Sequence, residues 1–261
     1  MLELTHVSKT FNPGTITEKK ALFDINLKLE DGDFVTVIGG NGAGKSTLLN
    51  LIAGVHSCDT GRIVLDGTNI TEMKEHVRAK YLGRVFQDPM MGTAANMEIE
   101  ENLAMAYRRG KKRTLAWGIS SKEHELYKEK LALLDLGLED RMHSKVGLLS
   151  GGQRQALTLL MATLQKPKLL LLDEHTAALD PKTAQKVLDL TEHFVQKDNL
   201  TTFMVTHNMN NAIRYGNRLI MMLEGHIVYD VRGEEKKNLK VQDLLEKFQS
   251  EGELNDRMIL G

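Results

Sequence analysis

The sequence predicts an α/β fold in which a helical segment is inserted into a core of alternating strands and helices. Apolar segments of strand length alternate with helix-like segments near both ends of the chain, whereas helical periodicity dominates from about residue 90 to 164. A glycine-rich loop near residue 40 joins a strand-like segment directly to a helix-like one. A chain of 261 residues is long enough for one large domain with such an insertion.

The N-terminal third is expected to form mainly strands. Apolar and polar residues alternate over residues 23–29, which predicts a half-buried strand, and Phe34–Ile38 reads as a buried strand stopped by two glycines. Lys45–Ala53 has helical spacing, with its leucines and isoleucine on one face. Arg62–Leu65 then predicts a strand that enters a tight Asp-Gly turn.

The remaining elements follow the same two periodicities. We expect helices at Met97–Tyr107, Lys122–Leu136, Gln153–Leu164 and Pro181–Val195, strands at Tyr81–Phe86, Lys168–Asp173 and Thr201–Thr206, and a hairpin of Asn217–Glu224 and His226–Asp230 joined at Gly225. The C-terminal segment from Val241 places Leu244, Leu245 and Phe248 at helical spacing. A helix docked on the core is favoured there over one that binds a partner.

Composition limits the possible functions. The net charge of −1 provides no overall field for nucleic acid, and we expect no nucleic-acid partner. Cys58 is the single cysteine, which rules out an intramolecular disulfide framework. No apolar run approaches the roughly 20 residues of a bilayer span, and the N-terminus carries no secretion signal pattern, so a cytoplasmic protein is expected.

The segment from residue 39 to 47 satisfies the phosphate-loop pattern G-x-x-x-x-G-K-[ST] between a buried strand and a helix. Glycines allow the backbone to coil closely around phosphate oxygens, and the N–H groups at the helix start form an anion site. Lys45 is expected to bind the β- and γ-phosphates of ATP, and Ser46 to bind Mg²⁺. The residues expected to hold the nucleotide here are Gly39, Asn41, Gly42, Ala43, Gly44, Lys45, Ser46 and Thr47.

Two further motifs indicate an ATPase. Leu169–Leu172 is an apolar strand that ends in two carboxylates, with Asp173 expected at the Mg²⁺ and Glu174 expected to activate the attacking water. Upstream, Leu149-Ser150-Gly151-Gly152-Gln153 opens a long helical segment. Ser150 is a credible N-cap, and the two glycines leave backbone N–H groups accessible, so this is a second anion-binding helix start.

An LSGGQ motif between a phosphate loop and LLLLDE resembles the ATP-binding-cassette (ABC) family, over residues 2–230. The resemblance implies a P-loop NTPase with an N-terminal antiparallel β subdomain, an ATP-binding domain of residues 1–235 with its helical subdomain at about 90–164, and a helical tail at 236–261. It also implies roles for residues outside the three motifs: Gln87 as a catalytic and Mg²⁺-sensing residue, Asp180 in a loop that crosses a dimer interface, His207 as a catalytic contact to the γ-phosphate, and Phe11 stacked on adenine.

The chain departs from the family pattern at His175, which stands where a proline usually follows the catalytic glutamate. A tolerated loop substitution is the favoured interpretation. The alternatives are an altered orientation of Glu174, or a pH-sensitive neighbour to it.

The family resemblance implies a head-to-tail dimer of two copies, in which Ser150, Gly151, Gly152 and Gln153 of one copy close over ATP held by the other. It further implies separate transmembrane permease subunits, an extracytoplasmic substrate-binding protein, and a place at the cytoplasmic face of the cell membrane. An importer is favoured, since one cassette per chain resembles importers more than fused exporters, and segment 12–22 resembles a subgroup of uptake ATPases for amino acids or related small solutes. A non-transport ABC ATPase, such as one for Fe–S cluster assembly, is the alternative, and a nucleotide-regulated module without turnover is disfavoured.

The basic segment 108–113 is either a solvated turn or a contact to anionic lipid.

Overall fold

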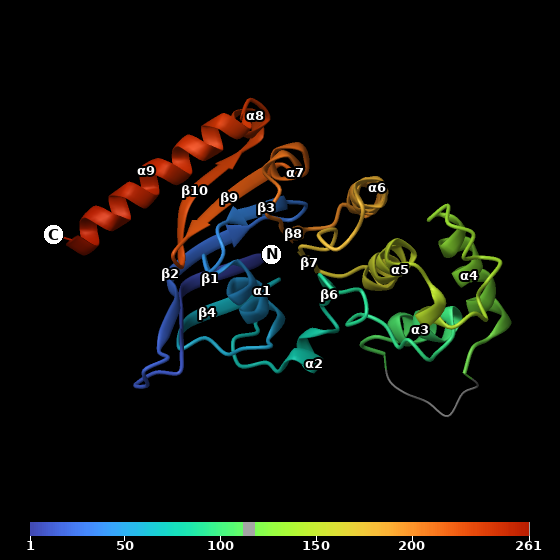
Figure 1. Ribbon diagram of the computed structural model, residues 1–261. Helices are drawn as coiled ribbons and strands as arrows, with labels where there is room; N and C mark the ends of the chain where they lie inside the picture. The colour runs from blue at the N-terminus through green and yellow to red at the C-terminus, as the bar shows by residue number, and fades with distance from the viewer. Residues whose placement is uncertain (112–117, 261) are drawn as a thin grey trace. The chain divides into compact units, whose positions relative to one another are not determined.

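The computed structural model describes residues 1–111 and 118–260 (Figure 1). It separates into two compact units, Met1–Arg78 with Thr201–Gly261 as the first and Ala79–Leu200 as the second. Each unit is described by itself. Among the described residues, no helix combines the length and apolar character needed to cross a bilayer.

The first unit contains an antiparallel sheet that begins at the N-terminus. Its strands are β1 (Leu2–Phe11), β2 (Lys19–Leu29), β4 (Thr60–Leu65) and β5 (Thr68–Asn69), in the order β2-β1-β4-β5. In β1 and β2, apolar residues that are fully buried alternate with exposed polar ones, which is the pattern of a sheet with one face in the core. The sheet confirms the expected antiparallel β subdomain.

Parallel strands in the same unit carry the phosphate loop. The parallel strands are β3 (Phe34–Gly39), β8 (Thr202–Val205) and β9 (Arg218–Leu223), and β10 (His226–Arg232) is antiparallel to β9. The central strand β3 pairs in parallel with β8 on one side and β9 on the other, and β9 turns back into β10. The carboxyl ends of β3 and β8 therefore lie at one edge of this sheet.

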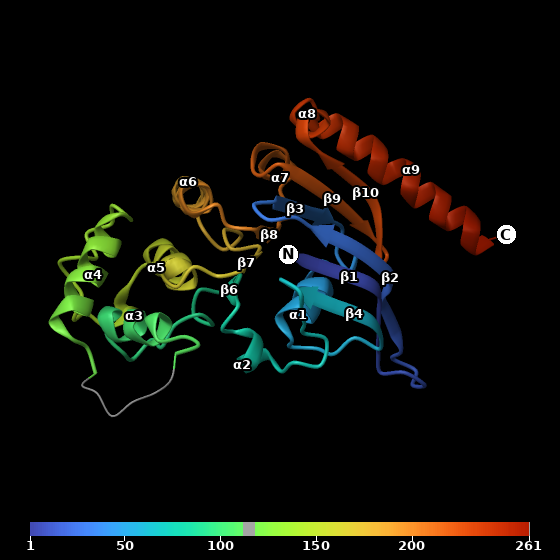
Figure 2. The same ribbon diagram turned by 180° about the vertical axis from the view of Figure 1, so that it is seen from behind.

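Five helices complete the described part of the first unit: α1 (Lys45–Ala53), α2 (Glu75–Arg78), α7 (Met209–Arg214), α8 (Gly233–Lys237) and α9 (Val241–Leu260). Helix α1 contacts β2 and β3, and α9 lies beside β10 (Figure 2). In α9, Leu244 is fully buried in a cluster with Met221 and Val231, and Phe248 packs against that cluster. The docked C-terminal helix is thus confirmed, although Leu245 remains 41% exposed.

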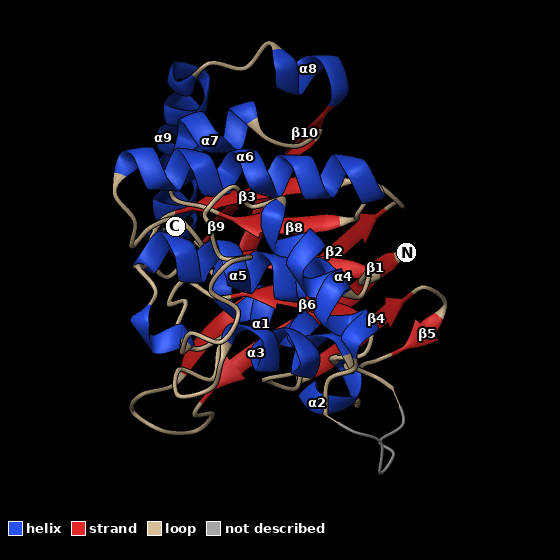
Figure 3. Cartoon of the chain, turned by 90° about the vertical axis from the view of Figure 1, so that its right-hand side faces the viewer, coloured by secondary structure: helices blue, strands red, loops and turns tan. Residues whose placement is uncertain are grey.

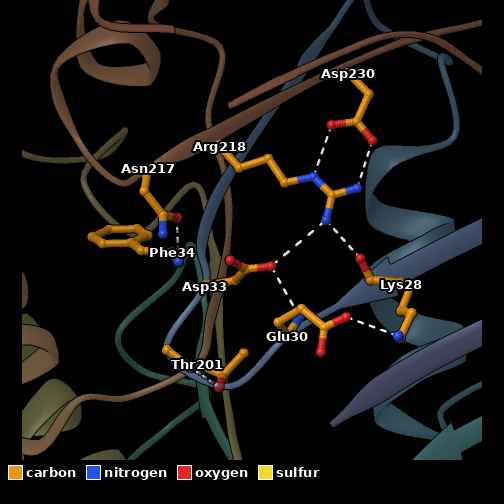
Figure 4. A network of polar contacts seen from close by, with 9 residues as sticks. Lys28, Glu30, Asp33, Phe34, Thr201, Asn217, Arg218 and Asp230 are labelled. Atoms are coloured by element: carbon orange, nitrogen blue, oxygen red, sulfur yellow. Dashed lines mark hydrogen bonds and ion pairs between the residues drawn. The ribbon is translucent and has the colours of Figure 1, made fainter. Parts of the chain in front are cut away.

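Arg218 joins both sheets of the first unit where β3 begins (Figure 4). Its guanidinium donates to both oxygens of Asp230, to the carbonyl of Lys28 at 2.6 Å, and lies 3.6 Å from Asp33. The carboxylate of Asp230 raises the pKa of Arg218, which is only 8% exposed. Because bidentate pairs fix both position and orientation, this cluster holds the ends of β2 and β3 in register with β9 and β10.

The second unit combines two parallel strands with helices. Its elements are β6 (Leu82–Val85), α3 (Ile99–Tyr107), α4 (Ser121–Ala132), the 3₁₀ turn η1 (Val146–Leu148), α5 (Gly151–Leu164), β7 (Leu169–Asp173) and α6 (Pro181–Asp198). Helix α5 is central and contacts β6, α3, α4 and α6 (Figure 3). Helix α4 ends earlier than expected because the chain turns through Asp135 and Gly137, both at positive φ.

Two arginines of the basic segment serve packing within the second unit. Arg109 donates to the carbonyls of Ala162 and Gln165, at 3.2 and 2.8 Å, which satisfies the C-terminal end of α5. Arg108 pairs with Glu123 at 3.0 Å. Lys112 and Arg113 lie outside the described residues.

Candidate nucleotide site

The phosphate loop follows β3 without interruption. The Lys45 ammonium group donates to the carbonyls of Gly39 and Gly40, at 2.7 and 3.0 Å, and the residue is only 7% exposed. Those two hydrogen bonds hold the ammonium group against the loop backbone, so the side chain does not extend into solvent. The loop is closed on its other side by Gly225, whose N–H donates to the Ala43 carbonyl at 3.1 Å.

At two positions of the loop, neighbouring atoms lie so close to the backbone that only glycine fits. At Gly44, φ is +98°, and a Cβ would lie 2.7 Å from a methyl group of Leu22 and 2.8 Å from the Ala21 carbonyl oxygen. At Gly39, a Cβ would lie 2.4 Å from the Met222 carbonyl oxygen of the neighbouring strand. Gly40, in contrast, has open space around its Cα. The glycines at the two ends of the motif therefore set the path of the loop.

The start of α1 is open to an anion. Its N-cap is Gly44, which has no side chain to accept the first N–H groups, and no acidic residue stands in the first turn. Ser46 is exposed there, and Thr47 is partly exposed. Uncapped N–H groups, a lysine ammonium and a serine hydroxyl form a donor set that suits the phosphates of ATP and an associated Mg²⁺.

The opposite end of α1 is fixed by a buried arginine outside the sequence motifs. Arg78 is 1% exposed and donates to the carbonyls of Leu51 and Ile52, at 2.6 and 2.9 Å. Its other nitrogens donate to the carbonyls of Met73 and Thr71, and burial lowers its pKa. By satisfying the last carbonyls of α1, Arg78 anchors the helix whose other end forms the anion site.

His207 lies at the same sheet edge as the phosphate loop. It follows β8, and the preceding Thr206 donates its N–H to the Val37 carbonyl of β3 at 3.0 Å. The His207 residue is exposed at this edge. Phe11 ends β1, where its ring is partly buried and packs edge-on against His56 at a centroid distance of 5.2 Å.

In the second unit, the carboxyl ends of β6 and β7 bring three predicted residues to one edge. Gln87 follows β6, Asp173 ends β7, and Glu174 comes next, since these strands are parallel with Val85 opposite Leu172. Arg84 of β6 lies 3.8 Å from the Asp173 carboxylate. Asp173 and Glu174 are partly buried, whereas Gln87 is exposed.

Glu174 has an unusual backbone. Its φ is +45°, in the left-handed region that non-glycine residues rarely adopt, and its carbonyl accepts the Ala177 N–H at 2.9 Å in the following turn. Such a conformation costs on the order of 1–3 kcal/mol and persists only where the surrounding structure imposes it. The chain bends at this residue as it leaves β7.

The Ser150 motif forms a capped helix start, as expected. The Ser150 hydroxyl accepts the Gln153 N–H, and the Gln153 side chain accepts the Ser150 N–H at 3.1 Å, so the two form a reciprocal capping box. A Cβ on Gly152 would lie only 2.0 Å from a methyl group of Thr183 on α6. Gly152 is therefore needed for α5 and α6 to pack at their N-terminal ends.

Asp180 and two α5 residues fix the loops around this motif. Asp180 caps α6 by accepting the Thr183 N–H at 3.1 Å, and its hydrogen bonds to Thr183 lower the pKa of the Asp180 carboxyl. Arg154 donates to the carbonyls of residues 146, 147 and 149 just before the motif. Gln155, fully buried, donates to the Phe86 carbonyl at 3.1 Å and so positions the backbone beside Gln87.

His175 is a buried core residue. It is 2% exposed, and its Nε2 lies 3.1 Å from the Thr191 hydroxyl, which itself donates to the Val187 carbonyl at 2.8 Å. The Thr191 oxygen is then an acceptor, so Nε2 carries the hydrogen. Burial lowers the pKa of His175 to about 4, which keeps the ring neutral around pH 7 and argues against a pH-sensitive neighbour of Glu174.

Replacing His175 with glutamine will flatten the dependence of stability on pH. Because the folded-state pKa is below the unfolded value, His175 favours folding above pH 6.5, and this contribution is lost as the pH falls toward 4. Between pH 7 and pH 4.5 the difference amounts to about 2.5 kcal/mol. Urea unfolding at pH 7 and pH 4.5 measures it, since glutamine keeps a donor toward Thr191 but does not titrate. Equal pH slopes in both proteins would contradict the burial argument.

Sequence reasoning missed Arg78, Gln155, Arg154 and Thr183. Each lies in a stretch with ordinary helix-like composition, and no local pattern distinguishes it. For Arg78, Arg154 and Gln155 the available signal was charge or polarity at core-facing positions of α2 and α5, since a buried arginine or glutamine needs backbone acceptors nearby, whereas no signal marked Thr183 on α6.

Comparison with known proteins agrees with this geometry. A family model described as ABC transporter matches residues 22–177. The tyrosine transport ATP-binding protein of Clostridioides difficile (strain R20291) is 47% identical over 250 residues, which cover 95% of this chain and 99% of that protein. The phosphonates import ATP-binding protein PhnC of Lactococcus lactis subsp. cremoris (strain SK11) is 32% identical, covering 88% and 92% of the two chains.

Solved structures show the same similarity in three dimensions. The dimeric post-hydrolysis state of the ATP-binding cassette MJ0796, bound to ADP and Pi, matches with a TM-score of 0.76 and 28% identity, over 89% of this chain and 98% of that one. The ADP conformation of the cassette MJ1267 matches with a TM-score of 0.76 and 27% identity, over 95% and 98%.

Proposed function

This chain belongs to the ABC transporter family, and we propose that it is the ATP-hydrolysing subunit of a transporter that imports a small solute such as an amino acid. ATP binding and hydrolysis are properties of the family. The observation that carries the proposal is the open N-terminus of α1 beneath a strand-borne glycine loop, with Lys45 held over it. The relatives named for tyrosine transport and phosphonate import support import as the process that this activity drives.

The site residues divide into those that hold the nucleotide and those that act on it. We assign Lys45 and the N–H groups of the loop to the β- and γ-phosphates, and Phe11 to the adenine ring. Mg²⁺ would be held by oxygen ligands from Ser46, Asp173 and Gln87, which are the ligand type it prefers. The ion would neutralise charge on the phosphates.

Two residues are assigned to the chemical step. Glu174 polarises the attacking water, and its left-handed backbone presents the carboxylate at the end of β7. His207, exposed at the carboxyl end of β8, donates to the γ-phosphate. Gln155 supports the neighbouring Gln87 through the Phe86 carbonyl and so acts as a positioning residue.

A dimer of two identical copies would complete each site. One chain carries two helix starts suited to anions, at α1 and at α5, and the second consists of Ser150, Gly151, Gly152 and Gln153. In a C₂ arrangement, the α5 start of one copy covers the ATP held by the α1 start of the other. Asp180, at the N-terminus of α6, belongs to the same surface through the Gly152–Thr183 contact. The dimeric state of a similar solved cassette supports this arrangement.

An import function implies further protein partners and a location for this chain. We propose separate permease subunits in the membrane, a substrate-binding protein outside it, and a peripheral position for this chain on the cytoplasmic face. Residues 1–235 would be the ATP-binding domain, with its helical subdomain at 90–164 and its tail at 236–261. The relative named for tyrosine transport favours an amino acid as the solute.

Reconstitution tests this function against the cluster-assembly alternative. The chain is co-expressed with the permease genes that neighbour its own gene, and ATP hydrolysis and solute uptake are measured in proteoliposomes across the amino acids. We expect co-purification and hydrolysis that rises with one solute and its binding protein. Co-purification with cluster-assembly proteins, and no response to membrane partners, would overturn the transport role while leaving the ATPase intact.

A further inference from the structure

A cluster of two histidines and two glutamates in the second unit takes no part in the proposed ATPase chemistry. His143 Nδ1 lies 3.0 Å from a carboxylate oxygen of Glu98 and 3.2 Å from one of Glu100. His124 Nδ1 lies 2.8 Å from the other oxygen of Glu100. One ligand atom each from Glu98, Glu100 and His143 lies within 4.8 Å of the other two.

The backbone holds the two ligand-bearing segments together. Glu98 forms a bridge with Lys145, the Ile99 N–H donates to the Ser144 carbonyl at 3.1 Å, and the Glu100 N–H donates to the Met142 carbonyl at 3.1 Å. These bonds link the start of α3 to the loop that carries His143. These bonds fix the backbone positions of the ligand-bearing residues, so an ion would have to order only the side chains of Glu98, Glu100 and His143.

Glu100 is the oriented member of the cluster. It is 8% exposed, and His124 engages its Oε2, which leaves Oε1 directed toward His143. A carboxylate whose second oxygen is hydrogen-bonded to a histidine is the arrangement that orients ligands at metal sites. The His143 side chain is 71% exposed, so the cluster is open to solvent on that side.

We propose that Glu98, Glu100 and His143 bind a divalent transition-metal ion such as Zn²⁺, with His124 orienting Glu100. Bonds of about 2.0–2.1 Å in a tetrahedral site place the ligand atoms about 3.3 Å apart. The present separations of 3.0 and 3.2 Å at His143 need only a small expansion to meet that value. Mixed imidazole and carboxylate donors favour zinc and its neighbours over Mg²⁺ or Ca²⁺. Solvent would supply the fourth ligand on the open side.

The competing occupant is a proton. The same short contacts suit a protonated His143 paired with the carboxylates, and its hydrogen bond to Glu98 raises the pKa of His143. A metal ion must displace that proton, so binding will weaken as the pH falls. Direct detection of the ion distinguishes the two occupants.

The test uses the full-length, nucleotide-free protein after treatment with a chelator. Co²⁺ is titrated at pH 7.5 while its visible d–d absorption is recorded, and Zn²⁺ is then added in competition. We expect one saturable, low-symmetry Co²⁺ site per chain that Zn²⁺ displaces. Replacing His143 with alanine will remove the absorption, and replacing His124 with alanine will weaken Co²⁺ affinity by about 10–100-fold.

Two control variants keep the result specific. His76→Ala removes an exposed histidine of the first unit, and Cys58→Ser removes the single thiol, and both should retain the wild-type signal. As a second readout, Zn²⁺ should raise the melting temperature of the wild type but not that of His143→Ala. No saturable Co²⁺ binding, or equal binding by wild type and His143→Ala, would overturn the proposal.

Discussion

Replacing Glu174 with glutamine is expected to stop ATP hydrolysis while ATP binding persists. Glutamine has nearly the same shape but cannot accept a proton from the attacking water, and loss of a general base lowers turnover by about 10²–10⁴-fold. The phosphate loop lies outside this change, so nucleotide affinity should stay within about threefold of wild type. Steady-state phosphate release and the binding of a fluorescent ATP analogue measure the two properties.

The same variant is expected to accumulate as a dimer in ATP. In the proposed dimer, hydrolysis would remove the γ-phosphate that holds the two copies together, so blocking hydrolysis is expected to favour the closed state. Light scattering during gel filtration should give twice the monomer mass with ATP and Mg²⁺, and the monomer mass with ADP. Turnover at the wild-type rate would refute the role of Glu174.

Glu224→Gln is the matched control for the Glu174 variant. Glu224 is an exposed glutamate with a φ of +47°, close to the +45° of Glu174, but it lies at the turn between β9 and β10. Any effect of placing glutamine in the left-handed region will appear in both variants. An effect on catalysis will appear only at Glu174.

Replacing Gly44 with alanine is expected to eliminate nucleotide binding. The new methyl group would meet the Ala21 carbonyl oxygen at 2.8 Å and a Leu22 methyl at 2.7 Å, at a backbone φ of +98°. Backbone strain and overpacking each cost about 1–3 kcal/mol, and relief requires the N-terminus of α1 to move. Isothermal titration with ATP should show at least a hundredfold loss of affinity, accompanied by a lower melting temperature.

Gly40→Ala provides the comparison within the same loop. A Cβ at Gly40 would have no atom within 4 Å, and Gly40 does not adopt a positive φ. This variant should therefore bind ATP within a few fold of wild type. If Gly44→Ala bound ATP as well as Gly40→Ala does, the loop would be more adaptable than its contacts indicate.

Much of the fold was predictable from the sequence because the signals are local. The apolar run Phe34–Ile38, the Lys45–Ala53 helix and the hairpin at Gly225 follow from period and turn chemistry within a few residues. The same holds for the Ser150 capping box, whose partners are three residues apart. Helix ends were less predictable, as at α4, because residues just beyond the periodic segment decide them.

The sequence by itself determined most of the longer strands and helices, the phosphate loop and the motifs that mark the family, since each is encoded over a short stretch of chain, whereas no individual prediction covered β1, α2, α7 or α8. Only the tertiary structure decided that Arg78 anchors α1, that Gly152 must lack a side chain beside Thr183, and that His175 is a buried neutral residue. It alone also brought His143 to Glu98, 45 residues earlier in the chain. Such contacts depend on how distant segments pack, and no local periodicity records which buried polar group will meet which acceptor.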